Sequence, residues 1–200
     1  MTDFQNTESG HAASHARTRS FTETPALAKL AADLLQTPSM LAGMSDAELR
    51  SVVSYLRLAS FPATAALFSQ GDASNTAYML LLLTGEVRVE VTHVVGTDPV
   101  EISVLGPGNV IGEMGLIDGA PRSSTCIAVT AVETAALSRK ALELMLVERP
   151  MLAAKLVIAL AKRLADRLRA LDEQLGLYVK LAHEAKLELD FERLSRTAGQ

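Results

Sequence analysis

The sequence predicts a mainly β domain, a sandwich, roll or barrel with flanking helices, followed by one long C-terminal dimerisation helix. Two patterns carry this prediction. Between residues 60 and 138, short runs of β-forming residues alternate with turn residues, which is typical of a sandwich, roll or barrel. After Ser138 the apolar spacing becomes helical and stays helical to about Arg193.

The N-terminal segment, residues 1–24, is rich in Ser, Thr, His and Ala and holds few large apolar side chains. We therefore expect a disordered arm. His11 and His15 are four residues apart, which would place them on one face of a helix as metal ligands. A disordered arm is a poor place for such a site, and we expect no metal there.

The second segment, residues 25–149, is the expected β-roll with its flanking helices. Pro25 begins an apolar, helix-like stretch that ends at Gln36. Ser45 and Glu48 form a capping box ahead of a second helix. The strands are expected in six runs: Ala66–Ser69, Tyr78–Leu83, Glu86–Val94, Val100–Leu105, Thr125–Thr130 and Thr134–Leu137.

The third segment, residues 150–195, is expected to be a coiled-coil helix. Pro150 suits the first turn of a helix. Apolar residues then recur with alternating spacings of four and three, a heptad seam typical of coiled coils. A seam this long exceeds what a small roll covers, which favours a parallel homodimer over a helix packed only on its own domain. The seam contains Val157, Ala161, Leu164, Leu168, Leu171, Leu175, Tyr178, Ala182, Ala185 and Leu189.

Composition limits the function classes. The chain has 19 Lys and Arg against 23 Asp and Glu, a net charge of −4, whereas nucleic-acid surfaces usually carry a basic excess. The single cysteine, Cys126, cannot form an internal disulfide, and its apolar strand position suits a small core residue. No secretory signal is visible, and no apolar run approaches the ~20 residues of a membrane helix. We expect a cytoplasmic protein without a membrane or nucleic-acid partner.

One stretch combines residue types that bind an anion with one that binds a sugar. A short helical stretch follows Gly112, and free N–H groups at a helix start favour an anion. Arg122 brings a planar, permanently charged fork that suits phosphate oxygens, and Glu113 is an acceptor for a sugar hydroxyl. The alternative is that Glu113 and Arg122 only pair with each other, although desolvation makes a buried pair costly. The candidate ligand-binding residues here are Gly112, Glu113, Met114, Gly115, Leu116, Arg122, Ser123 and Ser124.

The stretch also carries a family resemblance. Gly112-Glu113-Met114-Gly115-Leu116-Ile117 followed by Pro121-Arg122-Ser123-Ser124-Thr125 resembles the phosphate-binding cassette of the cyclic-nucleotide-binding domain family. The resemblance covers roughly Ala47 to Gln174. It implies an eight-stranded β-roll of the jelly-roll (double-stranded β-helix) type, flanked by helices, that binds a cyclic nucleotide, cAMP or cGMP, as a regulatory ligand.

The resemblance also implies roles for individual residues. Glu113 would accept the ribose 2′-hydroxyl, and Arg122 would bind the cyclic phosphate. Ser123 and the backbone N–H groups of residues 112–115 would help Arg122. The long helix after Pro150 would close over the base and form the homodimer, as in the catabolite-activator-like bacterial regulators.

Two features depart from those regulators. Arg167 stands where their dimer helix offers a threonine to the adenine edge. It could stack on a base or bond guanine O6 and N7, so cyclic GMP and a cyclic dinucleotide both stay open, with the dinucleotide the less favoured ligand. A surface or interhelical salt bridge is an equal alternative for Arg167. The second departure is that residues 177–200 are too few for a winged helix-turn-helix.

Three hypotheses follow for function. The first is a dimeric, non-enzymatic sensor that signals through its long helix to an unidentified protein effector. The second is a DNA-associated transcriptional regulator that lacks its own winged helix, and the third is a ligand-free dimerisation module. We expect no enzyme, because no catalytic constellation such as a G-x-S-x-G elbow is visible.

Overall fold

The computed structural model describes residues 17–36, 44–92 and 98–198 of the chain. In chain order the elements are β1 (Arg17–Ser20), the 3₁₀ helix η1 (Phe21–Glu23), α1 (Pro25–Leu35), α2 (Asp46–Ser54), β2 (Arg57–Phe61), β3 (Ala66–Phe68), β4 (Tyr78–Thr84), β5 (Val87–Val91), β6 (Val100–Leu105), β7 (Val110–Ile111), α3 (Glu113–Asp118), β8 (Thr125–Ala128), β9 (Val132–Ser138), α4 (Arg139–Glu148) and α5 (Pro150–Ala198). The chain forms two compact units, with the boundary between Val157 and Ile158.

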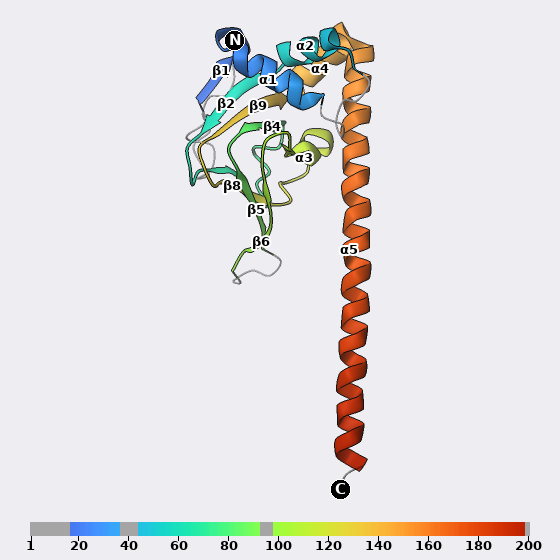
Figure 1. Ribbon diagram of the computed structural model, residues 1–200. Helices are drawn as coiled ribbons and strands as arrows, with labels where there is room; N and C mark the ends of the chain where they lie inside the picture. Colours follow the sequence, from blue (N-terminus) through green and yellow to red (C-terminus); the bar gives the residue numbers. More distant parts are fainter. Residues whose placement is uncertain (1–16, 37–43, 93–97, 199–200) are drawn as a thin grey trace. The chain divides into compact units, whose positions relative to one another are not determined.

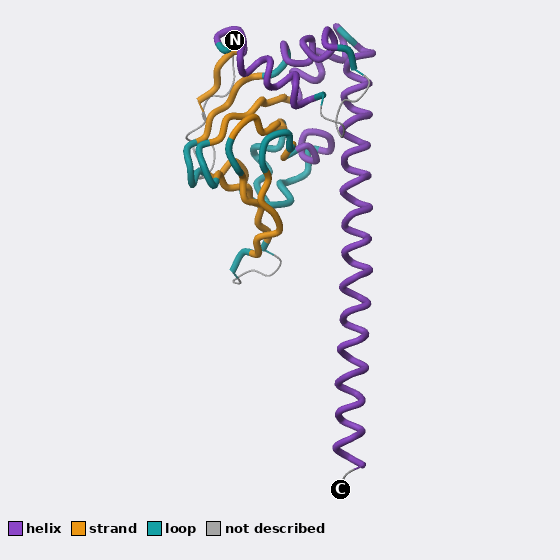
Figure 2. Tube along the Cα trace, in the orientation of Figure 1, coloured by secondary structure: helices purple, strands orange, loops and turns teal. Residues whose placement is uncertain are grey.

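Two antiparallel sheets form the centre of the first unit (Figures 1 and 2). One sheet has the strand order β1-β2-β9-β4-β7, and the other has the order β3-β8-β5-β6. Apolar side chains from both sheets share one core, among them Phe61 and Leu80 from the first sheet and Val87 and Cys126 from the second. The core position of Cys126 agrees with the prediction, and the arrangement confirms the predicted β-roll with flanking helices.

The N-terminal segment corrects one expectation. Arg17 to Ser20 forms β1, which pairs antiparallel with β2 at the edge of the five-stranded sheet, and Phe21 is buried. The prediction of a disordered arm through Thr24 is therefore wrong from Arg17 onward. An open sheet edge and one apolar anchor suffice to order a polar strand, and composition does not reveal either. Residues 1–16, which include His11 and His15, lie outside the described residues.

Strand β2 is a second difference from the prediction, which placed no strand at Arg57–Phe61. The segment is short and contains Ala59 and Ser60, which have little intrinsic β propensity. It becomes a strand because it lies between β1 and β9 and buries Leu58 and Phe61. Such a strand depends on its neighbours more than on its own residues.

The helices around the roll follow the predicted signals. Pro25 is the first residue of α1, and Ser45 caps α2 with both hydrogen bonds of the capping box present. The two helices pack against each other, and α4 follows directly from β9. Figure 1 shows α1, α2 and α4 gathered at the end of the roll where β9 leads into α4.

The second unit consists of the α5 residues from Ile158 onward. Apolar side chains of the predicted seam are exposed here: Leu168, Leu171, Leu175 and Tyr178 have 53% to 68% of their surface accessible. In a single chain this seam has no covering partner among the described residues of this unit. Within the described part of the chain, no helix has the length and apolarity needed to cross a membrane.

Candidate functional site

The cassette begins with a sharp change of chain direction at Gly112. Buried strand β7 ends at Ile111, and Gly112 adopts a positive φ of 76° before α3 starts at Glu113. A Cβ atom on Gly112 would lie 2.5 Å from Nη1 of Arg122 and 2.8 Å from Cζ of Phe68. Both the backbone conformation and the space therefore require glycine at this position.

Helix α3 presents two different faces. Glu113, Gly115 and Leu116 point inward and are buried, with Glu113 only 4% exposed. Met114 and Ile117 point outward and are about half exposed. Glutamate side chains are almost never fully buried unless they are paired, and this burial marks Glu113 as a functional candidate.

Arg122 extends its side chain inward, and its guanidinium donates to three backbone carbonyls. Nη1 lies 2.9 Å from the Gly112 oxygen. Nη2 lies 2.9 Å from the Tyr78 oxygen and also donates to the Asn75 oxygen. The side chain is 5% exposed. These three N–H groups bind neutral backbone carbonyls. They do not pair with Glu113, as the alternative interpretation of the sequence would require.

Two aromatic rings complete the surroundings of this guanidinium. Its central carbon lies 3.8 Å from the ring centroid of Phe68 and 4.9 Å from that of Tyr78, which are cation–π distances. The rings themselves contact each other, with centroids 5.4 Å apart. Burial lowers the pKa of the Arg122 guanidinium below its ordinary value.

One donor of the guanidinium is not used. The Nε of Arg122 is buried and has no hydrogen-bond partner among the described residues. Buried polar groups are nearly always satisfied, and exceptions call for an explanation. Here an anion would provide one, because it would both accept the free N–H and balance the buried charge.

The remaining cassette residues lie on the surface side. Ser123 is exposed, and its hydroxyl donates weakly to the Met114 sulfur at 3.9 Å. Ser124 is half-buried. The backbone of Arg122 pairs with the loop between β3 and β4, through Asp72 and Gly71, at 3.0 and 2.8 Å.

The structure thus brings together the cassette residues predicted on either side of the turn after α3. Arg167 is exposed on α5 in the second unit, and its contact with a base stays a prediction. Sequence reasoning missed the roles of Phe68 and Tyr78 and of the Asn75 carbonyl. Because aromatic residues make up only 4% of the chain, the two rings could have been singled out from the sequence. The carbonyl contact could not, because every residue has a backbone carbonyl.

Comparison with known proteins decides the family. Residues 58–149 match the model of the cyclic nucleotide-binding domain. A crystal structure of a cyclic nucleotide-binding domain from Methylobacillus flagellatus is 34% identical with a TM-score of 0.64, and the match covers 72% of this chain and 79% of that one. The chain belongs to the cyclic nucleotide-binding domain family.

Two further proteins with similar sequences come from bacteria. The cyclic AMP receptor protein of Thermus thermophilus is 33% identical over 124 residues, which are 62% of this chain and 56% of that protein. The N-terminal domain of a transcriptional regulator from Streptomyces coelicolor is 27% identical with a TM-score of 0.60, over 68% of this chain and 94% of that one. The chain spans 56% to 60% of the length of the curated relatives that it matches.

Proposed function

We propose that this protein is a non-enzymatic sensor that binds cAMP or cGMP in the cassette. The observation that carries the proposal is the buried Arg122 guanidinium with its unpartnered Nε. Carbonyl dipoles and ring faces only partly offset the cost of burying a cation. The singly charged phosphate of a cyclic nucleotide supplies the missing acceptor and the missing charge together.

The other cassette residues take the remaining parts of the ligand. Glu113 is assigned to the ribose 2′-hydroxyl, and Ser123 and Ser124 to the phosphate, beside backbone N–H groups of Gly112 and Gly115. Met114 and Leu116 belong to the same helix, α3, and are assigned to the binding segment with them. A cyclic dinucleotide fits less well, because this cassette offers one guanidinium for one phosphate.

Arg167 is assigned to the base. This assignment rests on the family resemblance, and a surface or interhelical salt bridge is the equal alternative for Arg167.

Calorimetric titration of the full chain with cAMP, cGMP and cyclic di-GMP tests the proposal. Arg122→Lys keeps the positive charge but loses the planar guanidinium. We expect the binding free energy to weaken by about 1.5–3 kcal/mol, or roughly 10- to 150-fold in affinity. Arg88→Ala, a half-exposed arginine on β5, is the matched control and should bind like the unmodified chain. Absence of heat with all three nucleotides, together with an unchanged melting temperature, would leave a ligand-free dimerisation module.

The output of the sensor is assigned to α5. Its exposed seam supports a homodimer, since an apolar stripe of this length is stable in water only when a second helix covers it. Ligand that binds the closed arrangement of this helix more tightly shifts the population toward it. An effector protein then recognises the re-aimed helix.

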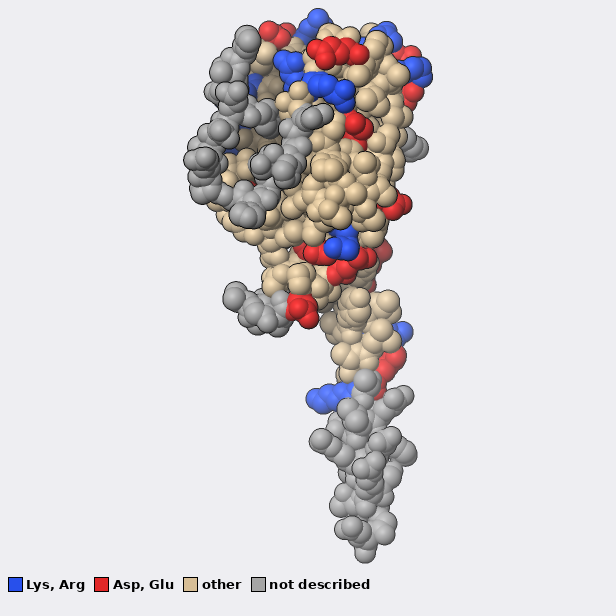
Figure 3. Space-filling model, turned by 90° about the vertical axis from the view of Figure 1, so that its left-hand side faces the viewer, with Lys and Arg blue, Asp and Glu red and all other residues tan. Residues whose placement is uncertain are grey.

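A DNA-associated regulator is a second candidate, because several relatives are named transcriptional regulators. These names count against our expectation that nucleic acid is not a partner. The charge of this chain does not favour direct contact: on the face in Figure 3, Lys and Arg alternate with Asp and Glu instead of forming a basic patch. A gel shift on genomic fragments, with and without cAMP, separates the two candidates, and retardation only with ligand would favour the regulator.

A further inference from the structure

Strand β5 reaches the end of its ladder with β8 before the chain leaves the sheet. The last pair in this ladder joins Glu90 to Thr125, the first residue of β8. Val91 still pairs with Val100 of β6 on the other side, and Thr92 follows directly after the strand. The backbone of Thr92 therefore lies beyond the β8 ladder and needs a hydrogen-bond partner other than β8.

The side chain of Gln70 is this partner. Its Nε2 donates to the Thr92 carbonyl at 3.2 Å, and its Oε1 accepts from the Thr92 amide at 2.7 Å. Two residues of an antiparallel pair exchange one donor and one acceptor in the same way. The Gln70 side-chain amide thus takes the place of a peptide unit at the end of β5.

The backbone around Gln70 binds the cassette. The Gln70 amide donates to the Thr125 hydroxyl at 3.0 Å. The Gly71 amide donates to the Arg122 carbonyl at 2.8 Å, and the Arg122 amide donates to the Asp72 carbonyl at 3.0 Å. Three consecutive residues of the loop between β3 and β4 are therefore bonded to the cassette.

The main chain of Arg122 is thus held by a loop that is itself attached to β5 through Gln70. The guanidinium depends on this placement, because it must reach the carbonyl oxygens of residues 75, 78 and 112 at once. Binding groups must be held within about 0.5 Å of their productive geometry. Release of the loop at Gln70 therefore loosens the group that meets the ligand.

We propose that Gln70 is a positioning residue for the phosphate of the ligand: by binding Thr92, it holds the loop that fixes the backbone of Arg122. The inference rests on the proposed function and adds to its site a residue outside the cassette. Gln70 acts through Arg122, so its contribution depends on the planar guanidinium. The side chain is exposed, and its replacement leaves no cavity in the core.

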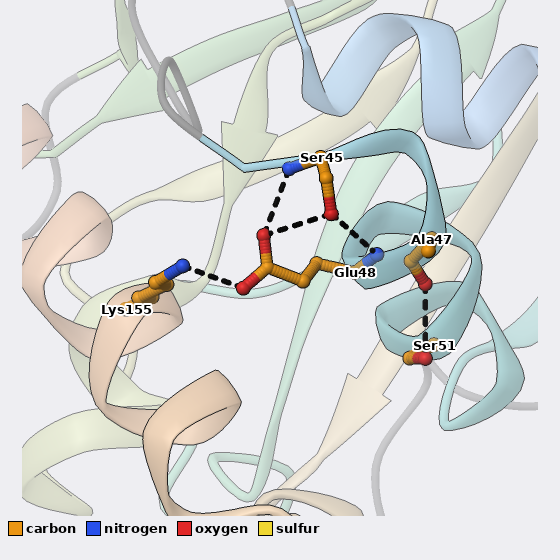
Figure 4. A network of polar contacts seen from close by, with 5 residues as sticks. All are labelled: Ser45, Ala47, Glu48, Ser51 and Lys155. Atoms are coloured by element: carbon orange, nitrogen blue, oxygen red, sulfur yellow. Dashed lines mark hydrogen bonds and ion pairs between the residues drawn. The ribbon is translucent and has the colours of Figure 1, made fainter.

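The polar network at the start of α2 provides a matched control (Figure 4). The Ser51 hydroxyl donates to the Ala47 carbonyl at 3.0 Å, a side-chain-to-backbone hydrogen bond like those of Gln70. In the same network, Glu48 binds Ser45 and Lys155. These residues belong to α2, its cap and α5, and not to the cassette. Ser51→Ala therefore removes a comparable hydrogen bond from another part of the fold.

Hydrogen exchange of the full chain without ligand tests the attachment to β5. Gln70→Met keeps the length of the side chain but loses both hydrogen bonds to Thr92. We expect faster exchange in peptides that cover residues 87–92, because the Thr92 amide loses its acceptor. Ser51→Ala should leave the exchange of these peptides unchanged.

Calorimetric titration with cAMP and cGMP tests the role in binding. Gln70→Met should weaken the affinity by about two- to tenfold, the equivalent of one hydrogen bond. Thr125→Val, which removes the hydroxyl that accepts from the Gln70 amide, should weaken it to a similar extent, and Ser51→Ala should bind like the unmodified chain. In an Arg122→Lys background, Gln70→Met should have no further effect, because the flexible ammonium of lysine does not require a fixed planar group.

Three results would overturn the inference. The first is an exchange rate at residues 87–92 that does not rise in Gln70→Met. The second is an unchanged affinity in this variant although the exchange has risen. The third is an equal loss of affinity in the arginine and lysine backgrounds, which would give Gln70 a general structural role. Absence of binding to the unmodified chain is a different outcome, because it removes the proposed function while the exchange result, obtained without ligand, still stands.

Discussion

The guanidinium of Arg122 contacts three carbonyl oxygens and two ring faces, and the Asp72 carboxylate acts on it electrostatically. These groups hold the side chain in a fixed place before any ligand arrives. Pre-organisation of this kind reduces the entropy that binding would otherwise cost. In the proposed function, Phe68 and Tyr78 therefore belong to the binding site, although neither needs to touch the ligand.

Gly112→Ala tests the packing around this guanidinium. The left-handed backbone alone costs about 1–2 kcal/mol for alanine, and the clash with Arg122 and Phe68 adds about 1–3 kcal/mol of overpacking. Gly71→Ala is the control, since Gly71 has a φ of 81° but nothing within 4 Å of the added Cβ. Urea unfolding of both variants should show Gly112→Ala as the less stable. Equal losses of unfolding free energy in the two variants would mean that the packing around Arg122 tolerates the methyl group.

At the level of single residues, sequence reasoning finds charged and hydroxyl side chains and misses the groups that position them. Glu113, Arg122 and the cassette glycines were predicted together, and the structure places them together. The carbonyls of Asn75 and Tyr78 that position Arg122 were not predicted, because every residue has a backbone carbonyl.

Among the elements, α2 and the start of α5 share an ion pair whose pH dependence is testable. Hydrogen bonds from Lys155 and Ser45 lower the pKa of Glu48 from its ordinary value of 4.5 to about 2. Because this pKa is depressed in the folded state, the contact stabilises the protein fully above about pH 4.5 and is lost as the pH falls toward 2. We expect the stability difference between the unmodified chain and Glu48→Gln to be constant near neutrality and to shrink between these values.

Thermal melts of both proteins from pH 7 to pH 2.5 measure this difference. Glutamine retains the capping-box hydrogen bond to Ser45, so the variant isolates the charge of Glu48. The variant Lys29→Gln, which removes the exposed partner of Asp33 on α1, is the control for a general charge effect. A difference that stays constant down to pH 2.5 would show that Lys155 does not stabilise the ionised carboxylate.

Helix α5 contains a residue of low helix propensity, Gly176, and nothing lies within 4 Å of a Cβ atom added to it. Alanine is favoured over glycine in a helix interior by about 1 kcal/mol. Gly176→Ala should therefore raise the helix content and the melting temperature of the full chain, as measured by circular dichroism. An unchanged or lower melting temperature would indicate that the glycine serves a close helix–helix approach.

The elements predicted from sequence are those whose own residues decide their structure. Helix α1 starts at Pro25, and α2 and α4 start directly after the capping residues Ser45 and Ser138. The strands β1 and β2 were missed because their partners in the sheet decide them. Local signals cannot show that Arg17 will face Ser60.

For the whole molecule, the exposed seam of α5 predicts association. Leu171→Glu places a charge in the middle of the seam and should convert a dimer into a monomer, as measured by light scattering behind size-exclusion chromatography. Lys180→Glu, an exposed residue outside the predicted seam, is the control and should leave the mass unchanged. A monomeric mass for the unmodified chain at micromolar concentration would contradict the prediction that the seam forms a homodimer.

Strand β1 has a practical consequence for handling the protein. It occupies the edge of the five-stranded sheet, and Arg19 reaches Ser60 and Glu133 across that sheet. A shortened chain that begins at Pro25 exposes the unpaired N–H and C=O groups of β2 and loses Phe21 from the core. Open edges of this kind template intermolecular pairing. A chain that begins at Pro25 is therefore expected to aggregate, whereas a chain that begins at Arg17 keeps β2 paired with β1.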